Sequence, residues 1–191
     1  TVLDALPIST GRVIYVSTTG VYAQDAGEWV DEASATAPLR EGGRACLSAE
    51  HLLLAHARGE DAVVLRMAGL YGDGRIPREN DVRQSRSVAG SPEAYLNLIH
   101  VDDAARAVVG AADRAQTRGQ TYVLSDSHPA TRAEYVGVVA AGLGLPPPLF
   151  TGGRGRGKRV RNARAVRELD LQLRYASFRE GLAGMGSSLV R

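Results

Sequence analysis

The stretch RVIYVSTTGVY at residues 12–22 decides the fold, because a β-branched apolar run ends there in a cluster of hydroxyl side chains. A nearly continuous apolar run is typical of a strand that is covered on both faces of a parallel sheet. Two further runs share this character, AVVLR at 62–66 and TYVL at 121–124. We therefore expect three buried strands that lie far apart in the sequence and adjacent in one sheet.

Helical segments fall between these strands. Apolar residues mark one side of residues 43–58, and paired carboxylates open a helix that runs from Val101 to about Arg114. Another helix is expected at 131–143, with Thr131 as its N-cap and Glu134 completing a capping box. Strands that alternate with helices predict an α/β fold with a Rossmann-like, doubly wound parallel sheet.

The remaining segments are shorter or more polar. We expect a helix end at 2–7, a surface loop at 23–43, and an irregular excursion with one short helix at 72–94. A single short strand is expected at 95–100, and Asn162 is expected to cap a short helix. The Gly- and Arg-rich residues 152–159 are predicted to form a basic loop, and 178–185 a last helix.

Composition excludes several classes of protein. The chain has 191 residues, a formal net charge of +2 and one cysteine, Cys46, so a disulfide framework and a cysteine-built zinc site are excluded. No apolar run reaches the length of about 18–20 residues that a membrane helix needs. Residues 152–159 resemble an RGG-like tail, but no aromatic residue lies between Phe150 and Tyr175 for base stacking. We expect a cytoplasmic protein that binds neither nucleic acid nor membrane.

Three motifs carry a family resemblance. The segment STTGVY at 17–22 is similar to the serine/threonine segment of extended short-chain dehydrogenases/reductases, the NAD-dependent epimerase/dehydratase family. RMAGLYGDGR at 66–75 resembles their R-x-x-x-x-Y-G-P-G-R strand end, and NLIHVDD at 97–103 resembles their I-H-V-D-D helix start. All three agree in order and spacing. The resemblance implies an NAD(P)-dependent epimerase, dehydratase or reductase that acts on a sugar-like or nucleotide-linked substrate.

The catalytic pair of that family is altered in this chain. The family places Tyr-x-x-x-Lys on the helix after the serine strand, and anchoring on Glu50 puts Gly42 and Cys46 at these two positions. Glycine has no proton to give and cysteine supplies no permanent cation, so activity is expected to be altered or lost. The resemblance leaves Thr18 as the catalytic hydroxyl and Tyr22 as a stand-in phenol. Two other interpretations remain open, namely a Thr18 that satisfies backbone groups at a strand end and a Tyr22 that packs beside the site.

The resemblance also assigns binding residues. Contacts to the cofactor, NAD or NADP, are expected from Ser17, Met67, Ala68 and Leu70. Substrate contacts are expected from Gly69, Arg75, Asn97, Arg156 and Lys158. The two basic residues suit a phosphate or carboxylate, or simply belong to a solvated loop. His100 is interpreted as a structural residue, and Asp102 and Asp103 as cap and dipole partners, so no metal site is expected.

The glycine-rich phosphate loop of the family, Gly-x-x-Gly-x-x-Gly, is not present in these residues. We therefore expect the chain to be the later part of the domain, to bind a dinucleotide poorly by itself, and to form a dimer or join a complementing N-terminal polypeptide. Residues 1–71 and 101–124 are assigned to the remainder of the dinucleotide-binding domain, and 72–100 and 125–191 to a small substrate-side lobe. The alternatives to an enzyme are a non-catalytic NAD(P)-binding sensor or scaffold, and one subunit of a split domain.

Overall fold

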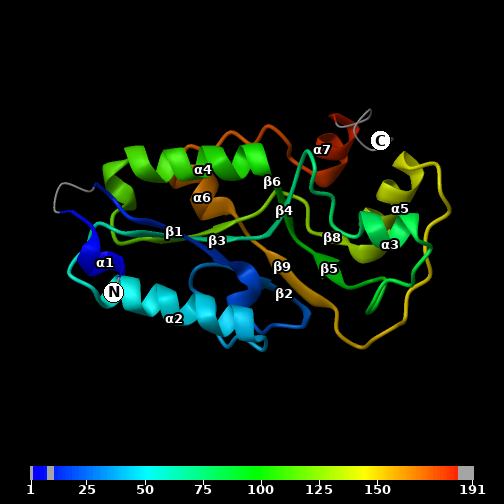
Figure 1. The fold of residues 1–191 in the computed structure, drawn as a ribbon, viewed down its shortest axis with the longest axis horizontal. Coiled ribbons are helices and arrows are strands. Elements are labelled where there is room, and N and C mark those ends of the chain that lie inside the picture. The colour runs from blue at the N-terminus through cyan, green and yellow to red at the C-terminus, as the bar shows by residue number, and fades with distance from the viewer. Residues whose placement is uncertain (1, 8–10, 185–191) are drawn as a thin grey trace.

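A computed structural model describes residues 2–7 and 11–184, and a three-stranded parallel sheet lies at its centre (Figure 1). The strands β1 (Ile14–Thr18), β3 (Val63–Met67) and β7 (Thr121–Leu124) follow the order β1-β3-β7. Thr18 is in register with Met67, and Met67 with Leu124, so the three strands end at one common edge. The three predicted strands and the α/β fold are confirmed, but the expected burial of β1 on both faces is wrong, because among the described residues β1 is an edge strand whose Val16 is half exposed.

Helices cover both faces of this sheet. Helix α2 (Glu41–Ala55) lies on one face, and α4 (Val101–Asp113) lies on the opposite one (Figure 1). The alternation of side chains along a strand explains this arrangement. Val63, Leu65 and Met67 pack with α4 and with α6 (Ala163–Glu168), whereas Val64 packs against Leu53 of α2. Every residue of β3 is buried, as its continuous apolar run predicts.

A second parallel sheet has only two strands, β2 (Ala26–Val30) and β9 (Gly157–Val160). The predictions of a surface loop at 23–43 and a basic loop at 152–159 are therefore wrong where these strands lie. Both strands are short, each contains a glycine and a charged residue, and they pair across about 130 residues of intervening chain, so local propensity gives little signal for them. Val30 and Val160 pack against Val123, which places this ribbon on the α2 side of the main sheet.

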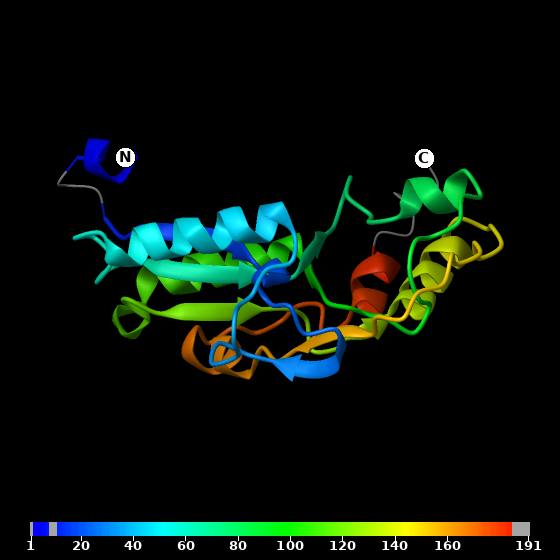
Figure 2. The same ribbon diagram turned by 90° about the horizontal axis from the view of Figure 1, so that it is seen from below.

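A smaller lobe lies at one end of the molecule, where α3, α5 and α7 surround a second hydrophobic cluster (Figures 1 and 2). Its buried aromatic residues are Tyr71, Tyr135 and Phe178. The elements not yet placed are α1 (Val2–Ala5), η1 (Thr19–Val21), β4 (Gly69–Tyr71), α3 (Glu79–Arg83), β5 (Tyr95–Leu96), β6 (Leu98–His100), η2 (Ala115–Thr117), β8 (Ala130–Thr131), α5 (Arg132–Gly142) and α7 (Phe178–Gly184). Ala165, Leu169 and Leu171 belong to the segment 125–191 that we assigned to this lobe, but they pack with the main sheet. The division of the chain into two units stays a prediction.

The expected single strand at 95–100 is two strands that pair with different partners. β5 pairs antiparallel with β8, and β6 pairs parallel with β4. Asn97 separates them, because its side-chain amide bonds to the backbone of β9 on both sides: Nδ2 donates to the Lys158 carbonyl at 2.8 Å, and Oδ1 accepts from the Val160 N–H at 2.8 Å. Asn97 therefore joins the small lobe to the β2–β9 ribbon.

Helix ends follow the sequence signals in part. The capping box of α5 is confirmed, since Thr131 and Glu134 each accept from the other's backbone N–H. His100 caps α4 as a structural residue, with Nδ1 accepting from the Asp102 N–H at 3.2 Å. Asn162 stands at the N-cap of α6 without a side-chain cap bond, because its amide donates to the carbonyl of Ser125 at 2.8 Å. None of the helices in the described part of the chain has the length and apolar character that a bilayer crossing requires.

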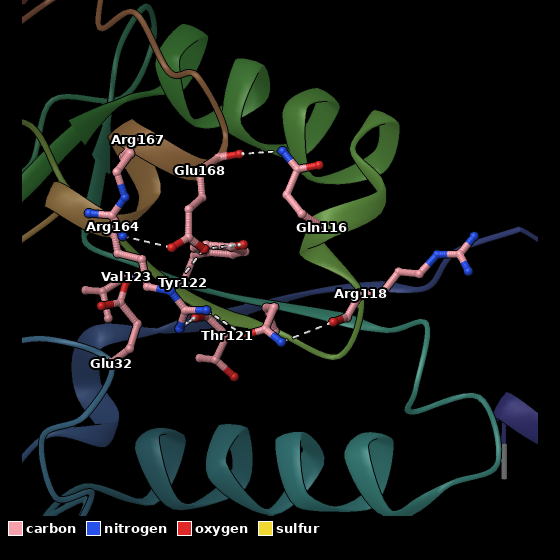
Figure 3. A network of polar contacts seen from close by, with 10 residues as sticks. Glu32, Gln116, Arg118, Thr121, Tyr122, Val123, Arg164, Arg167 and Glu168 are labelled. Atoms are coloured by element: carbon pink, nitrogen blue, oxygen red, sulfur yellow. Dashed lines mark hydrogen bonds and ion pairs between the residues drawn. The ribbon is translucent and has the colours of Figure 1, made fainter.

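The two outer edges of the main sheet differ. At β7 the Glu32 carboxylate accepts from the Val123 N–H at 2.9 Å, and Arg164 donates to the Thr121 carbonyl at 3.4 Å (Figure 3). Arg164 also bonds Glu168 and stacks on the Tyr122 ring, so side chains cover this edge. Within residues 2–7 and 11–184 no strand pairs with the outer edge of β1.

Candidate functional site

A cleft of about 450 Å³ opens where β1 and β3 end. Thr19 and Gly20 follow β1 and Gly69 follows β3, and all three line the cleft. In open parallel sheets, ligands bind outside the carboxyl ends of the strands, because the connecting loops part there. Tyr95 and Leu96 of β5 and Lys158 of β9 close the other side. With Leu39, Arg40 and Arg132, which also line it, segments from six parts of the chain meet at this cleft.

Four of the predicted site residues line this cleft, namely Tyr22, Gly69, Asn97 and Lys158. Gly69 is exposed, and a Cβ there would lie 3.1 Å from Leu98 Cδ2 and 3.2 Å from the Asn97 carbonyl oxygen. Lys158 donates from Nζ to the Tyr22 carbonyl at 3.0 Å, and its burial lowers the pKa of its ammonium. Since both polar ends of the Asn97 amide are bonded to β9, Asn97 shapes the cleft through the backbone that it holds.

Thr18 ends β1 and caps the following turn. Its Oγ1 accepts from the Gly20 N–H at 3.0 Å, which is the backbone-satisfying role. A hydroxyl that accepts one hydrogen bond still has a proton to donate. The structure thus shows the cap on η1, and Thr18 adjoins the cleft-lining Thr19 without lining the cleft itself, so its catalytic role stays a prediction.

A buried network lies behind the cleft. Ser17 donates from Oγ to Glu50 at 2.5 Å, and Arg66 donates from Nε and Nη2 to the same carboxylate. Arg66 Nη1 also donates to the Tyr22 hydroxyl at 2.8 Å. Burial raises the pKa of Tyr22, with the neighbouring Arg66 opposing this effect. Ser17 and Tyr22, only 5% and 3% exposed, thus direct their hydroxyls into this network.

The positions of the family's tyrosine and lysine lie on α2. Gly42 is exposed and has no atom within 4 Å of an added Cβ, whereas Cys46 is half-buried beside Tyr15. Burial and a hydrogen bond with Cys46 raise the pKa of the Tyr15 phenol. Neither of these two positions carries a phenol or a permanent cation.

The residues expected to hold a dinucleotide offer it little polar chemistry. Met67 and Ala68 are 5% and 6% exposed and pack in the α4-side core, which Leu70 also contacts. Ser17 is bonded to Glu50. At this edge the described residues would offer one end of a dinucleotide van der Waals and backbone contacts alone, and they include no glycine-rich cradle for its phosphates. The fit is therefore partial, and we assign no hydride-transfer step to these residues.

Two predicted substrate residues lie beside the cleft and do not line it. Arg75 is exposed, and its Nε donates to the Leu70 carbonyl at 3.1 Å. Arg156 is also exposed, and its backbone N–H donates to the Asp25 carbonyl at 2.8 Å. The Arg75 side chain thus contacts the nearby strand β4, and Arg156 joins the segment before β2 through its backbone.

Three charged residues that line the cleft, Asp25, Arg40 and Arg132, were not predicted from the sequence. Arg40 is the N-cap residue of α2, Arg132 is the first residue of α5, and Asp25 precedes β2. A charged residue in a turn or at a helix end is ordinary in any sequence. Arg66 did carry a signal, because a cation inside an otherwise apolar strand must find a partner.

Comparison with known proteins agrees with this geometry. The model of the family described as NAD dependent epimerase/dehydratase matches residues 1–125. Protein YeeZ of Escherichia coli K12 is 32% identical over 182 residues, covering 90% of this chain and 61% of that protein. The chain thus spans about three fifths of the length of this curated relative.

Two solved structures are similar over most of the chain. A functionally unknown conserved protein from Silicibacter pomeroyi has 29% identity and a TM-score of 0.78, covering 92% of this chain and 65% of that one. UDP-glucuronic acid 4-epimerase from Bacillus cereus, solved with NAD, has 19% identity and a TM-score of 0.80, covering 95% and 62%. The second likeness shows the fold alone.

Proposed function

Because this chain belongs to the NAD-dependent epimerase/dehydratase family, we propose that it forms the substrate side of an NAD(P)-dependent enzyme acting on a sugar-like or nucleotide-linked molecule. The observation that carries the proposal is the cleft at the carboxyl ends of β1 and β3, where Tyr22, Gly69, Asn97 and Lys158 meet. A nucleotide sugar suits such a hollow, which offers polar groups beside the rings of Tyr22 and Tyr95.

We propose that the activity of the enzyme differs from that of family members with the catalytic tyrosine and lysine. Thr18 retains a hydroxyl proton that could orient a substrate carbonyl, since its oxygen already accepts from Gly20. The Tyr22 phenol is a weak general acid in this setting, because burial raises its pKa and Arg66 occupies its oxygen. A bound NAD(P) would supply a hydride acceptor or donor, and Met67, Ala68 and Leu70 would contact its nicotinamide end.

A second candidate function is a non-catalytic sensor or scaffold that binds a ligand in the same cleft. Gly42 and Cys46 favour it, because the phenol and cation that drive proton transfer in the family have no counterpart at these two positions of α2. Turnover of a nucleotide sugar by the protein would argue against this candidate.

Binding of UDP-glucose, followed by calorimetry, tests the cleft. Gly69→Leu fills its floor, where even a Cβ would meet Leu98 and the Asn97 carbonyl, so binding should be lost. Gly137→Leu on α5 is the matched control, because an added Cβ there has nothing within 4 Å. Unaltered binding by Gly69→Leu, or none by the unmodified chain, would contradict the proposal.

The cofactor is tested separately by titrating NADH and NADPH into this 191-residue chain. We expect weak binding or none, because no glycine-rich loop is present to hold the phosphates. A Kd in the micromolar range would show that the cofactor is held in some other way.

A further inference from the structure

Three cations converge on the cleft without a carboxylate partner. Arg40, Arg132 and Lys158 all line it and come from three different elements. Within the described residues, no carboxylate lies within ion-pair distance of any of them. Arg66, in contrast, is paired with Glu50 at 2.7 Å. The cleft therefore gathers three cations against one acidic lining residue, Asp25, and is left with an excess of positive charge.

Two of these cations are fixed by neutral groups. Lys158 donates from Nζ to the Tyr22 carbonyl at 3.0 Å, and Arg132 donates from Nη1 to the Ala89 carbonyl. An ammonium has three N–H donors and a guanidinium has five, so each keeps donors for a ligand. Gly90, at φ +97°, makes room for the arginine, because a Cβ there would collide with its guanidinium. The positions of both side chains are thus built into the fold.

Burial and neighbouring charges shift the pKa of Lys158 and of Arg132. Burial lowers the pKa of Lys158, an effect that the Asp25 carboxylate opposes and Arg40 reinforces. Burial, Arg78 and Arg40 lower the pKa of Arg132, again against the attraction of Asp25. Asp25 is the single acidic residue among those lining the cleft, and its Oδ1 already accepts from the Gly157 N–H at 3.0 Å. Half-buried cations of like sign are unfavourable unless an anion joins them.

We propose that the cleft binds an anionic group, a phosphate or a carboxylate, between Arg132 and Lys158, with Arg40 adding long-range attraction. The inference rests on the proposed function in one respect, namely that the group is carried by a sugar-like substrate. Tyr95 and Leu96 lie beside these cations and provide surface for the uncharged part of that molecule. The substrate class is therefore an acidic or phosphorylated sugar, and a neutral sugar is disfavoured.

Calorimetry on the 191-residue chain with glucose 6-phosphate, glucuronate, glucose and inorganic phosphate tests the site. At least one anionic sugar should bind about tenfold or more tightly than glucose, since a charge-assisted hydrogen bond contributes about 1.5–3 kcal/mol. The phosphorylated and carboxylated sugars distinguish the two anions. Binding should also weaken as salt is raised.

Charge-removing variants locate the site. Lys158→Met and Arg132→Met should each weaken anion binding about tenfold, whereas Lys158→Arg should retain it. Arg118→Met is the matched control, because this arginine is 61% exposed and pairs with Asp61 elsewhere on the surface. Circular dichroism confirms that each variant is folded before its titration is compared.

The outcomes separate the two proposals. Glucose binding as tightly as both anionic sugars, or an equal effect of Arg118→Met, overturns the anion site and leaves the sugar cleft standing. Binding of inorganic phosphate that depends on Lys158 and Arg132, with neither these sugars nor UDP-glucose bound, supports the anion site and overturns the proposed function. No binding by any of the four compounds overturns the anion site, and the UDP-glucose titration then decides the proposed function by itself.

Discussion

Arg66 is the charged residue of an otherwise apolar strand, and its contacts explain how β3 tolerates it. The guanidinium meets the Glu50 carboxylate through both Nε and Nη2 and the Tyr22 hydroxyl through Nη1. Side chains of Arg66 and Glu50 are 10% and 1% exposed. The pair connects the sheet to α2 and holds the aromatic residue that lines the cleft.

Breaking this pair should destabilise the protein strongly. Glu50→Gln leaves a buried guanidinium without its counter-charge, and such a loss costs about 3–5 kcal/mol. The free energy of unfolding, measured by urea denaturation, should fall by that amount. Arg118→Met, which removes an exposed pair with Asp61, should change it by about 1 kcal/mol or less. An equal effect of both variants would show that the Glu50–Arg66 pair contributes no more than a surface contact.

Asp126 predicts a pH dependence. Burial raises its pKa to about 7, with Glu180 and Asp103 adding to the effect, and Oδ2 has no hydrogen-bond partner among the described residues. An unfolded aspartate has a pKa of about 4. Between these values the folded chain holds a proton that the unfolded chain has released, so stability falls as pH rises from about 4 to about 7.

Asp126→Asn tests this sign. The amide stays neutral, so the free energy of unfolding at pH 8 should rise by more than about 1 kcal/mol relative to the parent chain. At pH 4 the two proteins should differ little. Asp73→Asn, at an exposed position, serves as the control. A gain that is equal at both pH values would contradict a raised pKa.

The candidate site was predictable where motifs contribute to it. Tyr22, Gly69 and Asn97 belong to the three quoted motifs, and all line the cleft. Arg40 and Arg132 lie at helix starts, where any arginine is unremarkable until the fold places them together. Convergence of charge depends on tertiary structure and leaves no local pattern in the sequence.

At the scale of elements, the sequence predicted what hydrophobic periodicity can specify. The strands β3 and β7 and the helices α2, α4 and α5 each pack an apolar face into a core. The apolar run of β1 also forms a strand, but its apolar residues are only half-buried or exposed. β2 and β9 escaped prediction because backbone pairing and an asparagine hold them, rather than a regular apolar pattern. Strand pairing over such a sequence separation depends on contacts that neither segment specifies alone.

The covered edge of β7 gives a prediction at this scale. Glu32→Ala removes the acceptor of the Val123 N–H and leaves that donor partly buried, which costs about 1–3 kcal/mol (Figure 3). We expect a lower urea midpoint and faster amide hydrogen exchange at Val123. Glu32→Gln, which keeps an acceptor oxygen, should restore most of the loss. Unchanged exchange at Val123 in the alanine variant would rule out this role for Glu32.

At the scale of the whole molecule, the two sheet edges behave differently. β7 is covered by side chains, whereas β1 has no partner on its outer side among the described residues and carries Val16, which is 50% exposed. Both flanking helices also expose apolar residues: Leu52 on α2 is 66% exposed, and Val109 on α4 is 59% exposed. An open apolar edge favours pairing with another chain.

Val16→Lys tests this edge. The parent chain should self-associate as its concentration rises, and a lysine on the open strand should reduce that association, because a charge discourages edge pairing. Sedimentation velocity measures the change. Leu149→Lys, at a position that is 79% exposed in the small lobe, is the control and should have no effect. A parent chain that stays monomeric at high concentration would contradict the expectation.

The ribbon of β2 and β9 has a practical consequence. Trp29, the only tryptophan of the chain, lies on β2 with the guanidinium of Arg159 4.9 Å from its ring centre and that of Arg161 at 5.5 Å. Arg159 also stacks on Tyr95, which lines the cleft, and it follows Lys158 in the chain. Intrinsic fluorescence excited at the indole therefore comes from one known place beside the cleft, and the protein carries its own optical reporter of whatever displaces β9.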